Sequence, residues 1–498
     1  MDPDTGHPRR WAILAVLCLS LFVVVLDNTI LNVAVPSLLG DLDATTSDVQ
    51  WIIDSYSLVF AGLLLTAGSL GDRFGRRRGL LVGFALFGLG SLLAAFAETS
   101  GQLIAMRALM GVGGAFLMPG TMSILVNVFA EGERAKAFAV WGATSVLGVA
   151  CGPAVGGLLL EHFWWGSVFL VNVPVAVVAV IGIVALVPES HGPRRRPDVP
   201  GALLSTAGMS ALVWAIISAP EHGWGDAVTL GGLAVALLAL TGFAVRQHMA
   251  AEPMLDLRLL RERDFSGAAI MITLMAFALA GTLFALTQYL QMVLGYGPLK
   301  AGAALLPVAL SAAVCNGIGA SLDSRLGGRA TLAAGFVVIT AGFAGIALVG
   351  PGDGYGTLVI GLVVLGAGAG VGTPAAYNTL MAAVPTREAG VGSAVSDATQ
   401  EVGNALGVAV LGSVMAAAYA GALPAGTPAP ARRSLGAALS TGDPGLADAA
   451  RDAFVHAMSA AALAGAASTL AAAVLAVVVV RPRPAARVRS EAKEPASR

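Results

Sequence analysis

The feature that most constrains this chain is a succession of fourteen long apolar stretches separated by mostly short polar connections. Each stretch has about the 20 apolar residues that a helix needs to cross the ~30 Å hydrocarbon core of a bilayer. We therefore predict an all-α integral membrane protein with fourteen transmembrane helices. The predicted spans lie near 11–36, 50–71, 79–97, 102–127, 137–160, 166–187, 200–219, 228–246, 265–291, 299–322, 330–350, 355–380, 391–419 and 454–480.

The positive charges fall almost entirely into alternate connections between these stretches. If the amino terminus lies in the cytoplasm, the inner segments hold 24 of the 29 lysines and arginines. The outer loops hold only Lys300, Arg432, Arg433 and Arg451. Because lysine and arginine are retained on the cytoplasmic side during insertion, this imbalance predicts that both termini are cytoplasmic. One helix too many or too few would destroy the alternation.

The composition excludes several other classes of protein. A mean hydropathy of +0.80 with only 12% charged residues does not suit a soluble domain of 498 residues. The net charge of −1 gives no reason to expect nucleic acid as a partner, since the charges are sorted by membrane side. The first apolar stretch follows two arginines, as in a signal peptide, but it is too long to be one. Cys18, Cys151 and Cys315 lie in predicted spans without metal-ligand spacing.

A weak internal repeat predicts how the helices are grouped. GSLGDRFGRRR at 68–78 is echoed by ASLDSRLGGRA at 320–330, two helices into each half of the chain. The matching pairs, at an offset of 252, are Leu70 and Leu322, Arg73 and Arg325, Gly75 and Gly327, and Arg77 and Arg329. The repeat favours two pseudo-symmetric six-helix halves, 1–187 and 265–480, with two inserted helices in 188–264. The alternative is that any short basic inner loop looks like this.

The remaining segments are too short for a soluble catalytic domain. The residues 481–498 form a basic tail that we expect to be disordered, cytoplasmic and attracted to anionic lipid. The outer loop at 420–453 is rich in alanine, proline and glycine, and its DPGLADAARDAF segment is compatible with a helix.

Two charged residues in the predicted membrane interior are candidates for proton coupling. Asp27 lies about two-thirds of the way along the first span, and Arg107 lies at a similar depth in the fourth. A charge in the bilayer interior is costly, so both side chains should face the bundle. A carboxyl group there can bind and release a proton, whereas an arginine keeps its charge and can only act on a neighbour. The alternatives are a structural hydrogen-bond role for Asp27 and an Arg107 that reaches up to the outer interface.

Three further acids are candidates for binding a cation or a proton. Asp54 lies near the outer end of the second span, where it could attract a cation, or sit at the wet interface beside Tyr56. Asp397 and Glu401 are four residues apart in the thirteenth span and therefore share one helix face. We expect Glu401 to be the better candidate, because Asp397 is closer to the inner interface and could be solvated. Aromatic residues such as Tyr56, Trp141 and Tyr289 could add cation–π contacts.

Two glycine-containing segments suggest moving parts. The inner loop at 68–78 carries Gly68, Asp72, Arg73, Gly75, Arg76, Arg77 and Arg78, and we expect it to act as a conformational latch and not to touch substrate. In LGVACGPAVGG, the glycines 148, 152 and 156 recur at four-residue steps and are followed by Gly157. This spacing lets helices approach closely, and Pro153 is expected to bend the helix. Ordinary helix packing is an equally good reading of this stripe.

These motifs together resemble the major facilitator superfamily, in particular its 14-helix drug:proton antiporters of the EmrB/QacA-like type. GSLGDRFGRRR is similar to the inner-loop signature of that superfamily, and LGVACGPAVGG is similar to the antiporter motif. LDNTILNVAVP, the arginine pattern LIAMRALMGVGGA, QWIIDSYSL, WWGSVFLVNVP and PMLDLRLL also fit. The resemblance covers nearly the whole chain.

The resemblance implies a transporter that exports lipophilic, often cationic compounds in exchange for protons. It implies roles for Asp27, Asp54, Asp397 and Glu401 as acidic sites and for Arg107 as the coupling arginine. It also implies that Asp72 and Arg73 of the 68–78 loop are gate residues on the inner face. The residues that correspond to the antiporter motif are Gly148, Gly152, Pro153, Gly156 and Gly157. One departure concerns the tenth span, where Ala312 stands at the position of a further acid, which argues against transport of dications.

We therefore expect a proton-driven exporter of drugs, dyes or antibiotics that needs no cofactor and works as a monomer in lipid. The excess of arginine over lysine, with abundant alanine and glycine, indicates a GC-rich bacterial genome and hence the bacterial cytoplasmic membrane. A dedicated exporter of one antibiotic or metabolite is the main alternative. A nutrient importer, a membrane enzyme or a lipid-binding protein fits the four membrane acids less well.

Overall fold

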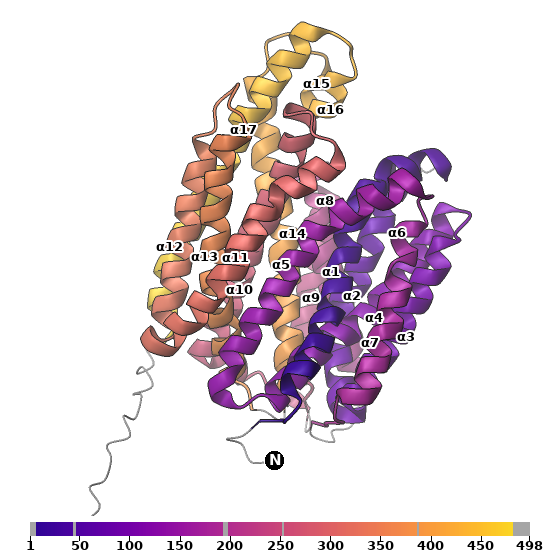
Figure 1. Cartoon of the computed structure of the whole chain (residues 1–498), viewed down its shortest axis with the longest axis vertical. Coiled ribbons are helices and arrows are strands. Elements are labelled where there is room, and N and C mark those ends of the chain that lie inside the picture. The colour runs from indigo at the N-terminus through magenta and orange to yellow at the C-terminus, as the bar shows by residue number, and fades with distance from the viewer. Residues whose placement is uncertain (1–5, 43–45, 193–197, 251–252, 386–387, 482–498) are drawn as a thin grey trace, which may run out of the picture.

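The computed structural model describes residues 6–42, 46–192, 198–250, 253–385 and 388–481 (Figure 1). The amino-terminal helices are α1 (Arg10–Asp41), α2 (Thr46–Phe74), α3 (Arg76–Ala95), α4 (Ser100–Val128), α5 (Glu131–His162), α6 (Ser167–Leu170) and α7 (Asn172–Leu186). The middle elements are α8 (Val199–His222), α9 (Ala227–Met249) and η1 (Leu259–Arg261). The remaining helices are α10 (Arg263–Gln288), η2 (Tyr289–Val293), α11 (Pro298–Leu326), α12 (Gly328–Ala347), α13 (Tyr355–Ala382), α14 (Ala389–Ala422), α15 (Ala429–Arg433), α16 (Leu435–Leu439) and α17 (Pro444–Val479).

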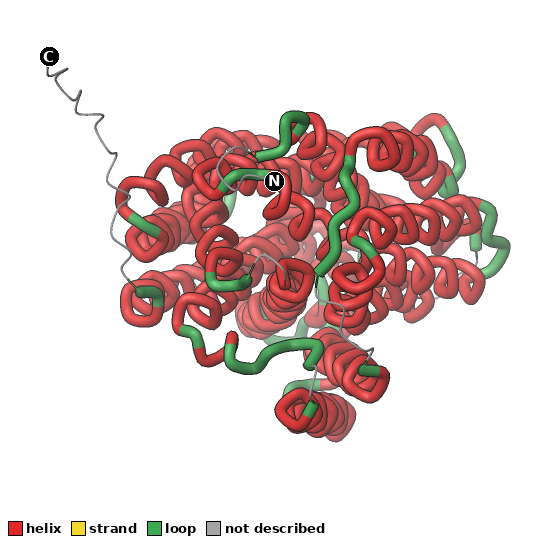
Figure 2. Tube along the Cα trace, turned by 90° about the horizontal axis from the view of Figure 1, so that it is seen from below, coloured by secondary structure: helices red, strands yellow, loops and turns green. Residues whose placement is uncertain are grey.

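The structure confirms the predicted number of membrane spans. Over the described residues, 14 helices are long and apolar enough to cross a membrane, and each of them overlaps one of the predicted stretches. The short α6 and the following α7 together make one of these spans, and α10 continues into the π-helix η2 to make another. No strand occurs in the described part of the chain, where only helices and loops are seen (Figure 2). This is expected because a helix satisfies all of its own backbone hydrogen bonds within lipid.

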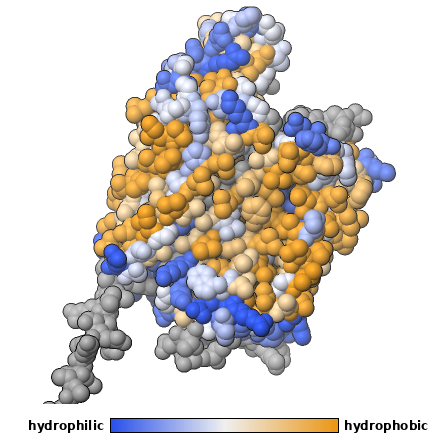
Figure 3. All heavy atoms as spheres, in the orientation of Figure 1, coloured by the Kyte–Doolittle hydropathy of each residue, from blue (hydrophilic) through white to orange (hydrophobic). Residues whose placement is uncertain are grey.

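The surface matches a protein surrounded by lipid. Large apolar side chains stay exposed along the flanks, for example Val177 and Ile181 on α7 and Leu237 and Leu238 on α9. Hydrophobic residues dominate the visible middle of the molecule, whereas hydrophilic residues gather toward the two ends (Figure 3). A monomer in water rarely exposes so much apolar surface. The chain is therefore a multi-pass membrane protein.

The helices pack so that a few of them join sequence-distant parts of the chain. Helices α1 to α7 pack among themselves, as do α10 to α14 with α17. Contacts between these groups come from α5, which packs on α11 and α13, and from α14, which packs on α2 and α4. The pair α8 and α9 joins the bundle where α8 packs on α2 and α14.

The described ends of the chain lie at one end of the bundle, which we call the basic end. His7 N donates to Val128 O at 2.8 Å, and Arg10 forms an ion pair with Glu133 between α1 and α5. Arg481 N donates to Asp264 Oδ1 at 3.0 Å, which places the end of α17 beside the start of α10. In Figure 1 the start of α1, in indigo, lies toward the bottom. The predicted tail beyond Arg481 and the arginines 194–196 and 387 lie outside the described residues.

The two repeated loops share a backbone feature that supports the repeat. Gly75 and Gly327, which match at the offset of 252, both have positive φ, at 116° and 81°. Residues other than glycine rarely adopt such angles. Each glycine separates two long helices, so each loop turns the chain back in the same way.

A salt-bridged cluster at the connections fixes the inserted helix pair. Asp198 caps α8 and accepts hydrogen bonds from Gly201 N, Arg246 Nε and Gln247 Nε2 at 3.1, 3.0 and 2.8 Å. Gln247 Oε1 in turn accepts from Met254 N at 2.6 Å, beyond the end of α9. Burial would raise the pKa of Asp198, but the donors from Gly201, Arg246 and Gln247 outweigh it and lower that pKa below its usual value.

The segment 420–453, predicted as an outer loop, is largely helical. α14 continues to Ala422, α15 and α16 follow, and α17 already begins at Pro444. The expectation that DPGLADAARDAF is helical is therefore confirmed, and the last helix starts ten residues before the predicted span.

Candidate functional site

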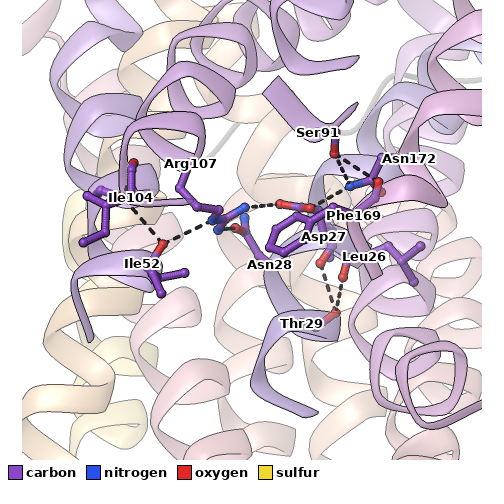
Figure 4. Close-up of polar contacts among 12 residues, drawn as sticks. Leu26, Asp27, Asn28, Thr29, Ile52, Ser91, Ile104, Arg107, Phe169 and Asn172 are labelled. Carbon is purple, nitrogen blue, oxygen red and sulfur yellow. Dashed lines mark hydrogen bonds and ion pairs between the residues drawn. The ribbon is translucent and has the colours of Figure 1, made fainter. Parts of the chain in front are cut away.

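The candidate proton-coupling residues form a buried ion pair between α1 and α4. Arg107 Nη1 donates to Asp27 Oδ2, and both side chains are almost completely inaccessible to solvent (Figure 4). A buried charge without a partner is expensive, so the two charges stabilise one another in the apolar bundle. The reading in which Arg107 reaches up to the outer interface is wrong, because the guanidinium turns inward toward α1.

Arg107 has further partners that hold its guanidinium in place. Its Nε donates to Ile52 O of α2 at 3.2 Å, and its Nη2 donates to Asn28 Oδ1 at 3.4 Å. Its guanidinium carbon lies 4.6 Å from the centre of the Tyr56 ring. Arginine suits this position because five N–H donors in a flat fork can serve several acceptors at once.

Glycines one and two turns after Arg107 bring α2 close to it. A Cβ atom at Gly111 would lie 2.7 Å from Tyr56 O, and one at Gly114 would lie 2.6 Å from Tyr56 Oη. Only glycine leaves room for this approach. The MGVGG sequence of the fourth span therefore positions Tyr56 beside the arginine.

The other oxygen of Asp27 is held by residues that the sequence analysis missed. Asn172 Nδ2, at the start of α7, donates to Asp27 Oδ1 at 2.7 Å and to Ser91 Oγ of α3 at 2.9 Å. Ser91 Oγ donates to Phe169 O of α6 at 3.2 Å. The available signal was an asparagine and a serine inside otherwise apolar stretches, SLLAAF and FLVNVP, which is weak without a partner in view.

The second group of candidate residues lies on α14 and the helices next to it. Asp397 is only 3% exposed, and both of its carboxyl oxygens are buried without a hydrogen-bond partner among the described residues. The expectation that Asp397 is solvated at the inner interface is therefore wrong. Glu401, the residue we preferred, is only partly buried. Asp397 and Glu401 both lie close enough to Tyr377 of α13 to interact with it electrostatically.

Aromatic side chains surround this second acidic group. Tyr377 Oη donates to Gln400 Oε1, and its ring packs edge-on against Trp141 of α5 at 5.3 Å between centroids. The Phe138 ring of α5 stacks on the Tyr377 ring at 6.3 Å between centroids. The Trp141 Nε1 atom is buried and has no hydrogen-bond partner among the described residues. Trp141 thus packs on Tyr377, the residue that interacts with both acids, whereas Tyr289 lies elsewhere and donates to Asp353 O at 3.1 Å.

Asp54 stands apart from both groups. It is half-buried on α2 and forms no hydrogen bond or ion pair with the described residues. Tyr56, two residues later, is the link between the groups, because it lies against Arg107 and also interacts electrostatically with Glu401 of α14.

Ala312, the position at which the sequence lacks a further acid, lies in a close contact between α11 and α13. The residue is 1% exposed on α11, and a Cβ atom at Gly370 of α13 would lie 2.9 Å from Ala312 Cα. The backbones of α11 and α13 therefore approach closely at position 312. The role of this position in dication transport stays a prediction.

The 68–78 loop contacts α14 at the basic end and so joins the helices α1 to α7 to the helices α10 to α17. Asp72 and Arg76 form a buried ion pair, with Arg76 Nε donating to Asp72 Oδ1 at 2.6 Å. Asp72 Oδ2 accepts from the backbone N–H of Gly390, at the start of α14, at 3.1 Å. A Cβ atom at Gly68 would lie 2.8 Å from Ala394 Cβ, so α2 and α14 cross in close contact here.

The other residues of this loop contact the chain after α7 or each other. Arg77 N donates to Glu189 Oε1 at 3.1 Å, and Arg78 Nε lies 3.8 Å from Glu189 Oε2. The guanidinium carbon of Arg73 lies 5.1 Å from the centre of the Phe74 ring. Among the predicted latch residues, Gly68 and Asp72 contact α14, and Arg76 binds Asp72.

The glycine stripe of α5 faces α1. A Cβ atom at Gly148 would lie 3.0 Å from Val25 Cβ, and one at Gly152 would lie 2.7 Å from Thr29 Cβ. Gly156 is buried and Gly157 is partly exposed further along the helix. The side chain of Pro153 lies outside the described part of the chain, and α5 is one continuous helix through that position.

Comparisons with known proteins agree with this geometry. The profile of the Major Facilitator Superfamily matches residues 17–408. The chain is 38% identical over 488 residues to the multidrug efflux pump LfrA of Mycolicibacterium smegmatis, covering 95% of this chain and 97% of that protein. It is 39% identical over 420 residues to the puromycin resistance protein pur8 of Streptomyces alboniger, covering 83% of each. It is 35% identical over 467 residues to the methyl viologen resistance protein SmvA of Salmonella typhimurium, covering 90% of this chain and 93% of that protein.

A solved structure shares the arrangement of helices. The crystal structure of the human organic anion transporter MFSD10 (TETRAN) superimposes with a TM-score of 0.64 at 17% sequence identity. The match covers 94% of this chain and all of that one. At this identity the likeness concerns the fold alone.

Proposed function

This chain belongs to the Major Facilitator Superfamily, and from that premise we propose that it is a proton-coupled antiporter that exports lipophilic, mainly cationic drugs, dyes or antibiotics. The observation that carries the proposal is the buried pair of Asp27 and Arg107. An ion pair inside the bilayer is costly to keep, which favours a functional role over a structural one. The relatives named for multidrug efflux and drug resistance support the same class of activity.

The pair has the chemistry that proton coupling requires. Arg107 keeps its charge at any physiological pH, whereas Asp27 can be neutralised by a proton. When Asp27 is charged, it binds Arg107 and holds α1 against α4. When a proton neutralises Asp27, the attraction weakens and the helices can separate. Protonation of Asp27 is thus coupled to a change in the packing of α1 against α4.

The rest of the transport cycle rests on relative movement of two halves. We place the halves at 1–187 and 265–480, with the helix pair in 188–264 between them. In the structure they touch through α5 with α11 and through α14 with α2, and Asp72 binds the α14 backbone at the basic end. Breaking the Asp72 contact would open this end, which we assign to the cytoplasm from the distribution of basic residues. The chain works as a monomer, because each half supplies one part of the path.

The substrate charge follows from the acids near Tyr377. Neither carboxyl oxygen of Asp397 has a hydrogen-bond partner in the described part of the chain. Both Asp397 and Glu401 interact with Tyr377, whose ring packs on Trp141. A negative potential in a site of low dielectric constant attracts cations, and an aromatic ring adds ~0.5–2 kcal/mol for a cation over its face. We therefore propose lipophilic monocations as good substrates. Asp27 is already paired with Arg107, so its charge adds little to this negative potential.

The available driving force is sufficient. Exchange of one proton for one monocation moves no net charge, so a pH difference of one unit supports roughly a tenfold gradient of substrate. Exchange of two protons moves one net charge, and a potential of 100 mV then adds ~2.3 kcal/mol. No cofactor is needed for either exchange.

A dedicated self-resistance exporter is the second candidate function. One relative is named for resistance to the single antibiotic puromycin, and another is the tetracenomycin C resistance and export protein of Streptomyces glaucescens. A narrow profile that includes one antibiotic and excludes simple dyes would favour this candidate. Methyl viologen, the compound in the name of the SmvA relative, is a dication, so a dication belongs among the compounds tested.

The deciding experiment measures efflux from bacterial cells and inside-out membrane vesicles that contain the protein. Uptake of a fluorescent lipophilic cation into the vesicles should follow an imposed pH gradient, and an ionophore that collapses the gradient should stop it. Uptake that persists without a gradient would refute proton coupling. A panel of dyes, quaternary ammonium compounds, a dication and several antibiotics would separate a broad exporter from a dedicated one, and a strict preference for anions would refute the charge argument.

A further inference from the structure

The orientation of the Asn172 side chain is set by its two neighbours. Its Nδ2 atom donates to Asp27 Oδ1 at 2.7 Å and to Ser91 Oγ at 2.9 Å. The single hydroxyl hydrogen of Ser91 is directed at Phe169 O, at 3.2 Å, so the oxygen of Ser91 must accept from the amide. Both neighbours therefore require the nitrogen of Asn172 to face them (Figure 4).

The amide oxygen of Asn172 has no hydrogen-bond partner among the described residues. The residue is completely buried, so water does not reach this atom from the surface. Buried polar atoms without a partner are uncommon in native proteins, and those that occur often mark a functional site. A free acceptor therefore lies on the same amide that donates to Asp27.

Asp27 changes its hydrogen-bonding needs when it takes up a proton. As a carboxylate it can only accept, and as an acid it must also donate one O–H. Arg107 has five donors and no acceptor, so it can serve the carboxylate but not the acid proton. Among the described residues, Asn172 is the one side chain bonded to Asp27 that can act both as donor and as acceptor.

We propose that Asn172 is a positioning residue that holds Asp27 in both protonation states, donating to the carboxylate through Nδ2 and accepting from the acid through Oδ1. The inference rests on the proposed proton coupling and extends it to a second partner of the same site. In this proposal the uncharged Asn172 side chain can donate to Asp27 or accept from it, whereas the charged Arg107 side chain can only donate.

The switch needs only side-chain rotations. A half turn of the Asn172 amide about its Cβ–Cγ bond exchanges Nδ2 and Oδ1. The Asp27 O–H then donates to Oδ1, and the hydroxyl of Ser91 turns from Phe169 O to the same oxygen, which has two lone pairs. After the exchange Nδ2 occupies the place of the unpaired oxygen, so the protonated state is held less firmly than the charged one.

The other charged and titratable groups around Asp27 come from three helices. Arg107 of α4 binds its second oxygen, Tyr56 of α2 lies against Arg107, and Glu401 of α14 interacts electrostatically with Tyr56. Helices α3 and α5 carry their charged residues near their ends, and α7 has none. A change at Asn172 therefore alters the protonation of Asp27 without removing a charge from the site.

The test is infrared difference spectroscopy of the purified protein in lipid after a change of pH. The Asp27 carboxyl band is identified by its loss in Asp27→Asn. In the unaltered protein we expect an amide C=O band to shift when Asp27 is protonated, and Ser91→Ala to change the position of that band. Asn172→Leu, which has nearly the same shape, should abolish the amide shift and move the acid C=O band of Asp27 to higher wavenumber.

Efflux measurements give a second readout. Because the carboxylate loses a donor in Asn172→Leu, we expect the pH of half-maximal efflux to move by about one unit toward alkaline pH. Asn127→Leu is the matched control, since its amide donates to Ser123 O within its own helix, at 2.7 Å, and should leave the pH profile unchanged. If Asn172→Leu does not fold, the amide shift in the unaltered and Ser91→Ala proteins still decides the question.

The outcomes separate this inference from the proposed function. Proton-coupled efflux that survives Asp27→Asn would overturn the proposed coupling itself. Loss of coupling in Asp27→Asn, together with no amide shift and an Asp27 band that does not respond to Asn172→Leu, would overturn only the role of Asn172.

Discussion

Replacing Asp27 with asparagine tests the central ion pair with the smallest change in shape. The substitution removes the one negative charge that Arg107 binds directly, while the guanidinium keeps Ile52 O at 3.2 Å, Asn28 Oδ1 at 3.4 Å and the ring of Tyr56 at 4.6 Å. The new amide has one oxygen in place of two. It can therefore accept from Arg107 or from Asn172, but not fully from both.

The expected cost to folding is moderate. Removing one partner of a buried ion pair typically costs ~3–5 kcal/mol because the remaining charge is left unpaired. Here three contacts to Arg107 survive and the new amide oxygen replaces part of the fourth, so we expect a loss of about 1–3 kcal/mol, near that of one or two hydrogen bonds to a charged group. Abundance in the membrane should thus stay near normal.

The effect on transport should be much larger than the effect on folding. The variant cannot change its charge, so efflux driven by a pH gradient should fall to the background of cells that lack the protein. Because the substitution imitates the protonated acid, exchange of labelled for unlabelled substrate in vesicles without a gradient should continue. Uphill efflux that follows the pH gradient in Asp27→Asn would refute the reasoning, and loss of both activities at normal abundance would show that Asp27 also binds substrate.

Three further changes test other parts of the structure. Asp72→Asn weakens the contact with the start of α14, and we expect slower turnover with little change in substrate affinity in vesicle uptake; a loss of affinity at unchanged turnover would contradict the latch. Gly152→Val drives a side chain into α1 and should lower both abundance and efflux, by ~1–3 kcal/mol of overpacking, whereas Gly132→Ala has open space around it and is the matched control. The depressed pKa of Asp198 means that its charge stabilises the folded protein above its unfolded pKa of about 3.9 and that this stabilisation is lost as the pH falls through the lower folded pKa. Thermal unfolding of Asp198→Asn should therefore lose stability at neutral pH and show a weaker dependence on acid pH than the unaltered protein, and an unchanged acid limb would exclude this role.

The features that the sequence predicts well are local ones. A membrane helix is recognised by some 20 consecutive residues, and its side by the charges next to it, so the fourteen spans and the two repeated loops could be found without any tertiary contact. The depth of Asp27 and Arg107 along their helices could be estimated in the same way. That estimate brought both residues to the same level, where the structure pairs them.

The depth of a residue along its helix did not predict which side chains meet. The sequence shows that Asp397 is acidic and roughly how deep it lies, but its burial depends on how α14 packs. In the structure Asp397 is more buried than Glu401, which we had preferred. Ala312 was interpreted from its position in a motif, and only the structure shows that it lies in a close contact between α11 and α13.

The sequence by itself determined that the chain has fourteen membrane-spanning helices and which ionisable residues it carries into the apolar interior, and it predicted how the loops are distributed between the two sides. The tertiary structure alone decided the partners of those residues. Asn172 binds Asp27 across 145 positions, and Gly390 binds Asp72 across 318. The hydropathy of a membrane helix depends only on its own consecutive residues, so the sequence shows it directly. A hydrogen bond between two helices depends on the rotation and tilt of both helices. Those are set by all the packing contacts of the two helices together.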